Sequence, residues 1–168
     1  MSDQRQASVL FVCMGNICRS PAGEGVFRDL VDKRGVADTV EIDSAGTIGY
    51  HTGNPADGRM RAAAKRRGYD LTSRARQVTR DDLERFDLVV AMDQDNYDDL
   101  VALNSAERGR VRMLGSFLPE ADGDGSPLGP DVPDPYYGGA DGFETVLDMI
   151  ERACPAILDA LTRPTDAR

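Results

Sequence analysis

A thiol and a guanidinium stand at the two ends of one short segment near the start of the chain. Five residues separate Cys13 from Arg19, and the segment lies between an apolar run at 9–12 and the pair Ser20-Pro21. The apolar run has the length of a buried strand, and Ser-Pro is typical of a helix N-cap followed by proline at the first helical position. The segment is therefore predicted to be a strand-to-helix turn. Its backbone N–H groups would converge at a helix N-terminus, where a phosphate dianion binds favourably.

The residue types in this segment suit a nucleophile that acts on a bound anion. A cysteine at a helix N-terminus beside a cation ionises more readily than an ordinary thiol, so Cys13 is the candidate nucleophile. Arg19 can grip two phosphate oxygens with its planar fork. Gly15 and Asn16 tolerate the unusual dihedrals of a tight loop. Ser20 can hydrogen-bond the thiolate as well as cap the helix.

The rest of the chain alternates between strand and helix patterns. Further strands are predicted at 40–44, 87–92 and 111–114. Helices are predicted at 21–34, 57–67, 79–85, 94–103 and 143–161. Pro155 should interrupt or bend the last of these helices. The alternation predicts an α/β fold, a single-domain doubly wound sheet of about four parallel strands with helices on both faces, and a site at the carboxyl ends of the strands.

Length and composition indicate one small globular domain. The chain has 168 residues, of which 40% are hydrophobic, and we expect a core at about 8–162 with a frayed tail after Pro164. It contains no 18-residue apolar run and no signal-peptide pattern, and its three cysteines are too few for a disulfide scaffold. We therefore expect a cytoplasmic protein with free thiols that does not bind membranes. Eighteen arginines against two lysines suggest a GC-rich bacterial genome.

Charge and metal-binding residue types exclude other classes of partner. The formal charge is -9 and the isoelectric point is near 4.6, so nucleic acid is not an expected partner. The sole histidine, His51, and the cysteine spacing offer no metal site, and no cofactor is expected. Basic residues concentrated between positions 59 and 80 are more typical of a solvated helix face than of a docking patch for acidic phosphopeptides. The oligomeric state is expected to be a monomer or a weak dimer.

A long connection at 116–142 carries a second candidate residue. The connection is rich in glycine, proline and aspartate, and a loop of this length in a compact domain is usually functional or disordered. Asp134 precedes Pro135, which keeps the segment extended. On composition alone, Asp134 is more typical of a solvated turn than of a site.

The sequence resembles the low-molecular-weight protein tyrosine phosphatases of bacterial type. The resemblance rests on Cys-x-Gly-Asn-Ile-Cys-Arg-Ser-Pro from Cys13 and Asp-Pro-Tyr-Tyr-Gly from Asp134, with further matches between them in the family's order, from about residue 8 to residue 160. It implies hydrolysis of phosphotyrosine in proteins through a cysteinyl-phosphate intermediate. In that mechanism Cys13 is the nucleophile, Arg19 holds the phosphate and Asp134 is the general acid and base. Phosphate or another oxyanion would bind as product or inhibitor.

The resemblance also implies roles for residues around these three. Asn16 and Ser44 match a pair that shapes the loop, and Ser73 stands where some relatives have a supporting histidine. Cys18 either fills space as a small buried hydrophobe or captures oxidised Cys13 in a disulfide. The aromatic residues among the expected substrate contacts can equally cover small apolar patches. The expected contacts are Met14, Gly15, Asn16, Ile17, Cys18, Ser20, Tyr50, His51, Tyr136 and Tyr137.

Three other functions compete with this interpretation. Arsenate reductases of this fold use further cysteines in the middle of the chain, whereas this chain has none between Cys18 and Cys154. Protein-arginine phosphatases carry a threonine at the position of Ile17, so the isoleucine favours phosphotyrosine. A catalytically inactive phosphotyrosine-binding module is the non-enzymatic alternative. The presence of the nucleophile, the arginine and the aspartate together argues against such a module.

Overall fold

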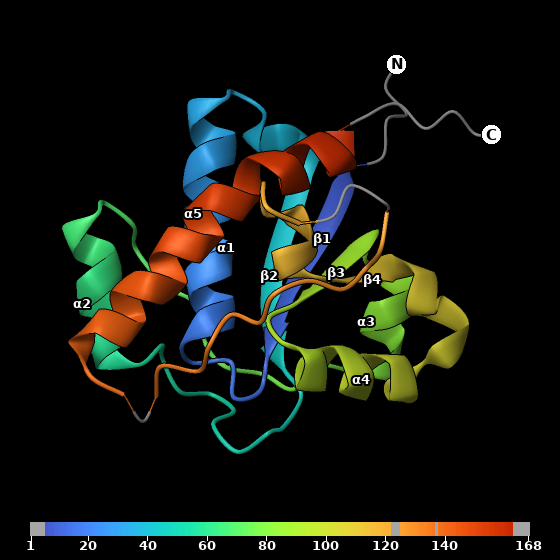
Figure 1. Cartoon of the computed structure of the whole chain (residues 1–168), viewed down its shortest axis with the longest axis horizontal. Coiled ribbons are helices and arrows are strands. Elements are labelled where there is room, and N and C mark those ends of the chain that lie inside the picture. Colours follow the sequence, from blue (N-terminus) through green and yellow to red (C-terminus); the bar gives the residue numbers. More distant parts are fainter. Residues whose placement is uncertain (1–5, 122–124, 137, 163–168) are drawn as a thin grey trace.

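The computed structural model describes residues 6–121, 125–136 and 138–162 (Figure 1). Within this part of the chain, one four-stranded sheet lies between two layers of helices. Its strand order is β2-β1-β3-β4, and every neighbouring pair is parallel. The strands are β1 (Ala7–Cys13), β2 (Val40–Gly46), β3 (Leu88–Ala91) and β4 (Val111–Met113). The predicted doubly wound α/β fold with four parallel strands is confirmed.

The residues of β1 explain why this strand lies at the centre of the sheet. Its apolar run is completely buried, as is typical of a parallel strand that is covered on both faces. Because successive side chains point to opposite faces, Val9 and Phe11 pack into one core, and Leu10 and Val12 pack into the other. The register places Cys13, the last residue of β1, beside Gly46, the last residue of β2.

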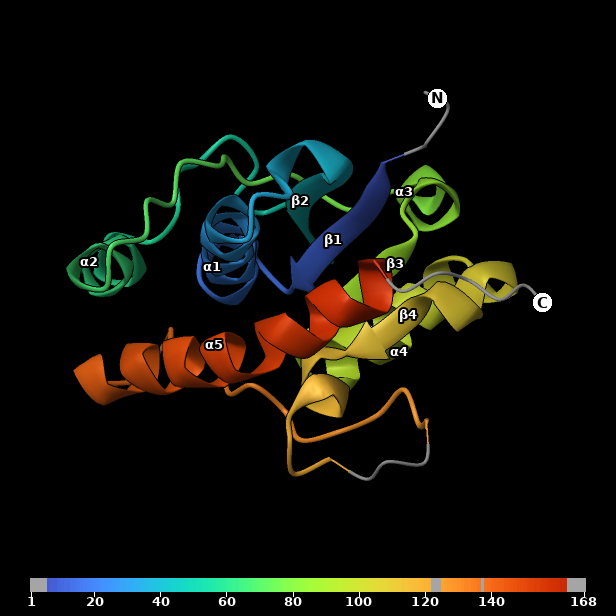
Figure 2. The ribbon, with the colours of Figure 1, turned by 90° about the horizontal axis from the view of Figure 1, so that it is seen from above.

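Helices cover the sheet on both faces (Figure 2). Helices α1 (Arg19–Lys33) and α5 (Ala140–Thr162) pack against one face, and α3 (Arg80–Arg85) and α4 (Gln94–Leu103) lie on the other. Helix α2 (Gly58–Arg66) packs against α5 rather than against the sheet. Short 3-10 helices occupy Ala37–Thr39, Ser105–Arg110 and Leu114–Phe117. No helix among the described residues has the length and apolar character needed to cross a membrane.

Helix boundaries agree with the sequence in most places. Thr79 caps α3 in a reciprocal capping box with Asp82, and the Asp57 side chain caps α2. The expected interruption at Pro155 is wrong, because α5 continues through this residue to Thr162. Its apolar face is buried on both sides of the proline, so packing offsets the lost backbone hydrogen bond. The predicted frayed tail after Pro164 lies outside the described residues.

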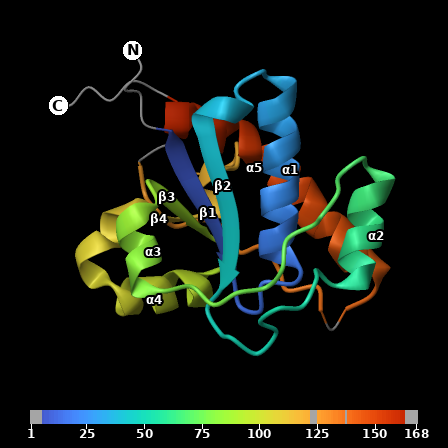
Figure 3. The same ribbon diagram turned by 180° about the vertical axis from the view of Figure 1, so that it is seen from behind.

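The direction of the chain crossover reverses at β1. From β1 the chain passes through α1 to β2 on one side, and it then returns to β3 on the other side of β1. In open α/β sheets a ligand binds at such a switch point, beyond the carboxyl ends of the strands. These ends lie at the lower edge of the sheet in Figure 3. The segment between Cys13 and Arg19 begins at this edge.

Close backbone contacts hold that segment against the end of β2. Thr47 donates its backbone N–H to the Cys13 carbonyl at 2.9 Å, and Ile48 donates to the Met14 carbonyl at 3.1 Å. A Cβ atom on Gly46 would lie 2.6 Å from the Met14 carbonyl oxygen, which is too close for any side chain. Glycine at this position therefore allows the segment to approach β2 closely.

Candidate active site

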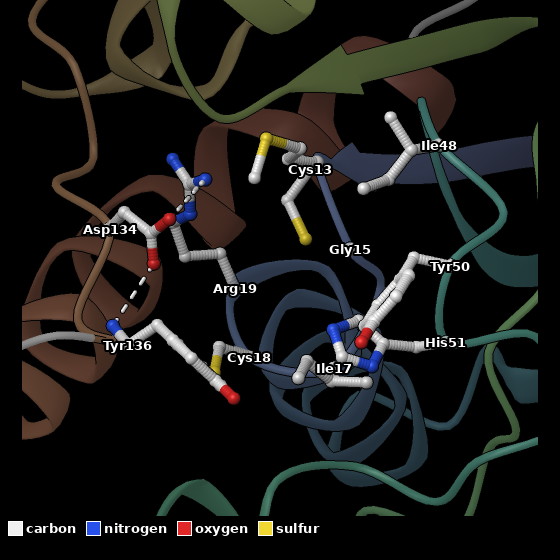
Figure 4. A pocket seen from close by; sticks show the side chains of 11 residues that line it. Cys13, Gly15, Ile17, Cys18, Arg19, Ile48, Tyr50, His51, Asp134 and Tyr136 are labelled. Carbon is white, nitrogen blue, oxygen red and sulfur yellow. Dashed lines mark hydrogen bonds and ion pairs between the residues drawn. The ribbon is translucent and has the colours of Figure 1, made fainter.

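A pocket of about 370 Å³ opens at the carboxyl ends of the strands (Figure 4). The structure brings ten of the sequence-predicted residues to its wall. Ile48, which was not singled out from the sequence, also lines it; its position just beyond the carboxyl end of a parallel strand is a signal that could have found it. Asn16, Ser20 and Ser44 lie behind the wall, where they are buried. The ten predicted residues are Cys13, Met14, Gly15, Ile17, Cys18, Arg19, Tyr50, His51, Asp134 and Tyr136.

The turn from β1 into α1 places the sulfur of Cys13 at a helix N-terminus. Helix α1 begins at Arg19 with Cys18 at the N-cap position, so the expected cap by Ser20 is wrong. The Ser20 hydroxyl lies 3.1 Å from Cys13 Sγ, and the Ser20 backbone N–H donates to the same sulfur at 3.4 Å. The serine therefore interacts with the thiol instead of capping the backbone. The sulfur thus lies at the N-terminus of α1, in contact with the hydroxyl and the backbone N–H of one residue.

Asn16 stabilises the turn through its backbone conformation and its side-chain hydrogen bonds. It has a positive φ of 59°, a conformation that asparagine tolerates better than most residues. Its side-chain oxygen accepts the backbone N–H of Arg76 at 3.0 Å, which fixes the orientation of the amide. The amide nitrogen then donates to the hydroxyls of Ser20 at 2.8 Å and Ser44 at 3.1 Å. Because Asn16 supplies the donor, the Ser20 hydroxyl keeps its own proton for an acceptor, and two lie within reach: the Cys13 sulfur and the Ala45 carbonyl at 3.3 Å.

The other branch of this network ends at a buried carboxylate. Ser44 donates its hydroxyl proton to Glu24 at 2.7 Å, and Arg28 donates to the second oxygen of Glu24 at 2.8 Å. Arg28 also donates to the carbonyl of Ile42 in β2 at 2.7 Å. The sequence did not single out Glu24 or Arg28, which form an i,i+4 pair on α1. Ser73 is half-buried and lines a small surface pocket beside Glu24 and Arg28.

Arg19 is a buried cation that contacts three residues on two separate segments of the chain. Only 3% of its side chain is exposed. Its Nη1 donates to Asp93 at 2.7 Å and to the carbonyl of Val132 at 3.0 Å, and its Nη2 lies 3.6 Å from an Asp134 oxygen. Burial lowers the pKa of Arg19, but the negative charge of Cys13 and the contact with Asp93 outweigh this effect and raise it. Arg19 therefore stays charged and its guanidinium plane is fixed.

Asp93 and Val132 were missed as site residues by the sequence. Asp93 follows β3 and also caps α4 by accepting the backbone N–H of Asn96 at 2.8 Å. Its position at the carboxyl end of a strand next to β1 is a signal that could have found it. Val132 contributes only its backbone carbonyl, so its side chain gives no signal for this role. The Val132 N–H donates to the Met92 carbonyl at 2.8 Å, which anchors the long loop at the site.

Asp134 projects from this anchored loop toward Arg19 (Figure 4). One carboxylate oxygen accepts the Tyr136 backbone N–H at 3.0 Å, a local turn that fixes the side chain. The other oxygen faces Arg19, and 37% of the side chain is exposed. Asp134 thus lies in a partly exposed turn, as composition suggests, and it also lines the pocket. A carboxyl group in this place can exchange a proton with an atom bound above Cys13.

Aromatic and apolar side chains form the mouth of the pocket. Tyr50 and His51 lie on the side opposite Asp134 in Figure 4, with their ring centroids 4.8 Å apart, and the His51 and Tyr136 centroids are 6.5 Å apart. Tyr50 is 83% exposed, so it does not cover an apolar patch. The His51 ring packs over Gly15, where a Cβ atom would lie 3.0 Å from it. The expected contact Tyr137 lies outside the described residues.

The three cysteines differ in environment. Cys18 lines the pocket, and burial, followed by the charges of Asp57 and Cys13, raises its pKa to about 12. Cys154 is buried on α5, where desolvation also raises its pKa. All three are free thiols. Among the described residues, no group of three or more histidine, cysteine or carboxylate side chains is arranged to hold a metal ion.

Replacing Asn16 separates the backbone and side-chain roles of this residue. Asn16→Ala and Asn16→Gly both remove the amide, so we expect both variants to bind inorganic phosphate about tenfold more weakly, by calorimetry. The alanine variant should also unfold at lower urea, because a Cβ atom at positive φ costs about 1 kcal/mol that glycine avoids. Wild-type phosphate affinity in Asn16→Gly would show that the amide does not shape the loop.

Comparison with known proteins identifies the family. Residues 8–167 match the model of the low molecular weight phosphotyrosine protein phosphatases. A low molecular weight protein-tyrosine-phosphatase of Streptomyces coelicolor is 46% identical over 162 residues, covering 95% of this chain and 96% of the relative. The human low molecular weight phosphotyrosine protein phosphatase is 40% identical, covering 95% and 98% of the two chains.

Solved structures lead to the same conclusion. The fold matches a crystal structure of a protein tyrosine phosphatase from Entamoeba histolytica with a TM-score of 0.85 and 39% identity, covering 93% of this chain and 97% of that one. That structure holds Hepes in its active site. With a thiol at a helix N-terminus, a buried arginine and a facing aspartate already in one pocket, the chain belongs to the low molecular weight phosphotyrosine protein phosphatases.

Proposed function

We propose that this phosphatase hydrolyses phosphotyrosine in proteins by double displacement, with Cys13, Arg19 and Asp134 as its catalytic residues. The main support for this assignment is that the three side chains converge on one pocket. The sulfur and the guanidinium lie at the two ends of one turn, and a carboxylate from a distant loop faces the guanidinium across the pocket. Ser20 supports the sulfur with two contacts, so the nucleophile is stabilised as the anion that attacks.

In the first step a phosphate ester occupies the turn above Cys13. Backbone N–H groups of the turn and the Arg19 guanidinium bind the non-bridging oxygens and stabilise their charge in the transition state. Cys13 Sγ forms a bond to phosphorus while the bond from phosphorus to the tyrosyl oxygen breaks. Asp134 gives its proton to that oxygen, because a phenol with a pKa near 10 leaves much more readily in neutral form.

In the second step water hydrolyses the cysteinyl phosphate. Asp134, now ionised, accepts a proton from water as the water oxygen attacks phosphorus. The sulfur–phosphorus bond breaks, and Cys13 returns as a thiolate. Inorganic phosphate is the product, and it competes with substrate for the same turn. The Asp93 and Val132 contacts hold Arg19 in one orientation through both steps, so little reorganisation is needed.

The rim favours an aromatic ester. A phosphotyrosine whose phosphate lies over Cys13 places its ring between Tyr136 on one side and Tyr50 with His51 on the other. Ile17 adds an apolar contact where protein-arginine phosphatases carry threonine. Arsenate reductases of this fold use further cysteines in the middle of the chain, whereas here the one cysteine besides Cys13 and Cys18 is Cys154, which is buried on α5 away from the pocket lining. We therefore rank phosphotyrosine above the other two substrates.

The leaving-group dependence of Asp134→Asn tests this mechanism. We expect the burst of phenol release from a phosphotyrosine peptide to slow by about 10²–10⁴-fold, the usual contribution of a general acid. An aryl ester with an acidic phenol should slow much less, because its leaving group departs unprotonated. The burst is the right measurement, since steady-state turnover also includes hydrolysis of the intermediate.

Asp131→Asn is the matched control for this experiment. Asp131 lies on the same loop, but its carboxylate accepts the Gln94 backbone N–H at the start of α4. Its substitution should affect the two esters equally. Equal slowing of both esters by Asp134→Asn would exclude Asp134 as the acid.

We further propose that Cys18 protects Cys13 from irreversible oxidation. Peroxide transfers an oxygen to Cys13 Sγ, giving a sulfenic acid and water. Cys18 Sγ then attacks Cys13 Sγ and displaces hydroxide, which leaves as water with the proton of Cys18, and a disulfide forms. Support comes from the position of both cysteines on one pocket. Because the pKa of Cys18 is about 12, this second reaction should accelerate as pH rises.

Recovery after oxidation tests this role. Wild type exposed to peroxide and then to dithiothreitol should regain most of its activity, whereas Cys18→Ser and Cys18→Ala should not, since their Cys13 proceeds to sulfinic acid. Cys154→Ser is the control for loss of a buried thiol away from the pocket and should recover like wild type. Equal recovery of all four proteins would show that Cys18 merely fills space.

The cellular setting is part of the same proposal. We propose a bacterial, cytoplasmic enzyme that acts as a monomer or weak dimer on tyrosine-phosphorylated proteins. Three free cysteines, one of which must stay reduced for catalysis, support a reducing compartment. The bacterial relative and the excess of arginine over lysine support a bacterial source.

A further inference from the structure

A second pocket of about 400 Å³ lies beside the active site, between α2 and the start of α5. Its charged residues are Arg59 and Arg66, which are about one-half and two-thirds exposed. Phe143 provides an aromatic wall, and small residues of α2 and of the turn into α5 complete the lining. The pocket thus combines two cations with an apolar interior. No step of the mechanism uses it.

Arg59 connects this pocket with the active site. The centre of its guanidinium lies 5.3 Å from the ring centroid of Tyr136, which lines the active site. It lies 4.9 Å from the centroid of Phe143, which lines the second pocket. The two rings are therefore within about 10 Å of each other. About three residues of extended chain span such a distance, so a peptide bound in one pocket can reach the other.

The two arginines are held in position by carboxylates of the protein. Arg59 Nε and Nη2 donate to the two oxygens of Asp57 at 3.1 and 3.0 Å, and Arg66 Nη2 donates to Glu144 at 3.1 Å. Each guanidinium carries five N–H donors, so these contacts orient the groups without using all of their donors. The partner carboxylates offset part of the positive charge. A ligand would therefore gain a modest electrostatic contribution, as is typical of exposed pairs.

Other basic residues of this region have structural roles. Arg61 donates to the carbonyl of Ala56, and Arg67 binds Glu144 and Glu151 on α5. Arg76 bridges carboxylates of the protein near the other side of the turn. The arginines named between positions 59 and 80 thus fall into two groups. Two arginines line a pocket next to the catalytic site, and the three named here stabilise the fold.

We propose that the pocket of Arg59 and Arg66 binds an acidic side chain of the protein substrate, within about three residues of its phosphotyrosine. A glutamate suits the site, because its carboxylate reaches the arginines while its aliphatic stem contacts Phe143 and the small residues. The pocket is then a specificity site. This inference rests on the proposed function, since it places the phosphotyrosine in the active site.

Paired peptides test the proposal. Each pair carries phosphotyrosine and differs only by glutamate or glutamine at one of the three or so positions on either side. We expect one position where glutamate raises kcat/KM about two- to fivefold, mainly through a lower KM, because the contact forms equally in ground and transition states. Arg66→Gln should abolish this preference, and Arg66→Glu should replace it with a preference for lysine.

Lys65→Gln is the matched control. Lys65 is an exposed neighbour on α2 that does not line the pocket, and its substitution removes the same charge. Lys65→Gln should keep the glutamate preference. Lys65→Gln and Arg66→Gln should both hydrolyse a small aryl phosphate at the wild-type rate. Two results would overturn the inference while leaving the proposed function intact. One is that glutamate is not preferred at any position; the other is that Lys65→Gln and Arg66→Gln lose the preference equally. Failure of the wild type to hydrolyse the small ester would instead refute the proposed function, and with it this inference.

Discussion

The pairing of one buried cation determines how the site is assembled. Burying a guanidinium is costly unless it is paired, and removing the partner of such a charge typically costs about 3–5 kcal/mol. Arg19 meets this requirement with Asp93 at the end of β3 and with the Val132 carbonyl on the long loop. The same contacts bring Asp134 close to Cys13, although the two residues are far apart in the sequence. Arg19 therefore also determines where the loop that carries Asp134 lies.

A second constraint is the direction of the hydrogen bonds beneath the turn. The backbone N–H of Arg76 fixes the Asn16 amide, and that amide donates to both serine hydroxyls. The Ser20 proton then has the Cys13 sulfur and the Ala45 carbonyl as possible acceptors, and the Ser44 proton is accepted by Glu24. One branch of the network thus ends at the sulfur, and the other ends at a carboxylate. The network thus gives hydrogen-bond partners to buried polar groups, which would be unfavourable if they were left unpaired.

Much of this organisation could be predicted from sequence, because it depends on local pattern. The apolar run before Cys13, the capping box at Thr79 and the alternation of strands and helices all act over a few residues. Ser20 was expected both to cap the helix and to contact the sulfur, and the folded turn keeps the contact with the sulfur without the cap. The interruption expected at Pro155 is absent because the packing of α5 outweighs a local preference. Local pattern therefore predicts the elements more reliably than the choice between competing contacts.

The residues missed in the site depend on tertiary structure. Asp93 and Glu24 are polar residues that local pattern assigns to a helix start and a helix face. Their contacts with Arg19 and Ser44 require the sheet order that brings β3 and β2 to either side of β1. Val132 acts through its backbone, which no side-chain pattern reveals. The second pocket likewise exists only because α2 packs beside the start of α5.

The proposed mechanism requires that phosphorus becomes bonded to Cys13 during turnover. The most direct measurement mixes the enzyme with an aryl phosphate, quenches the reaction within the burst of phenol release and maps the added phosphate by mass spectrometry of the digested chain. We expect one phosphate on Cys13, formed at the rate of the burst and absent from Cys13→Ser. Phosphate on another residue, or phenol release by Cys13→Ser at the wild-type rate, would contradict it.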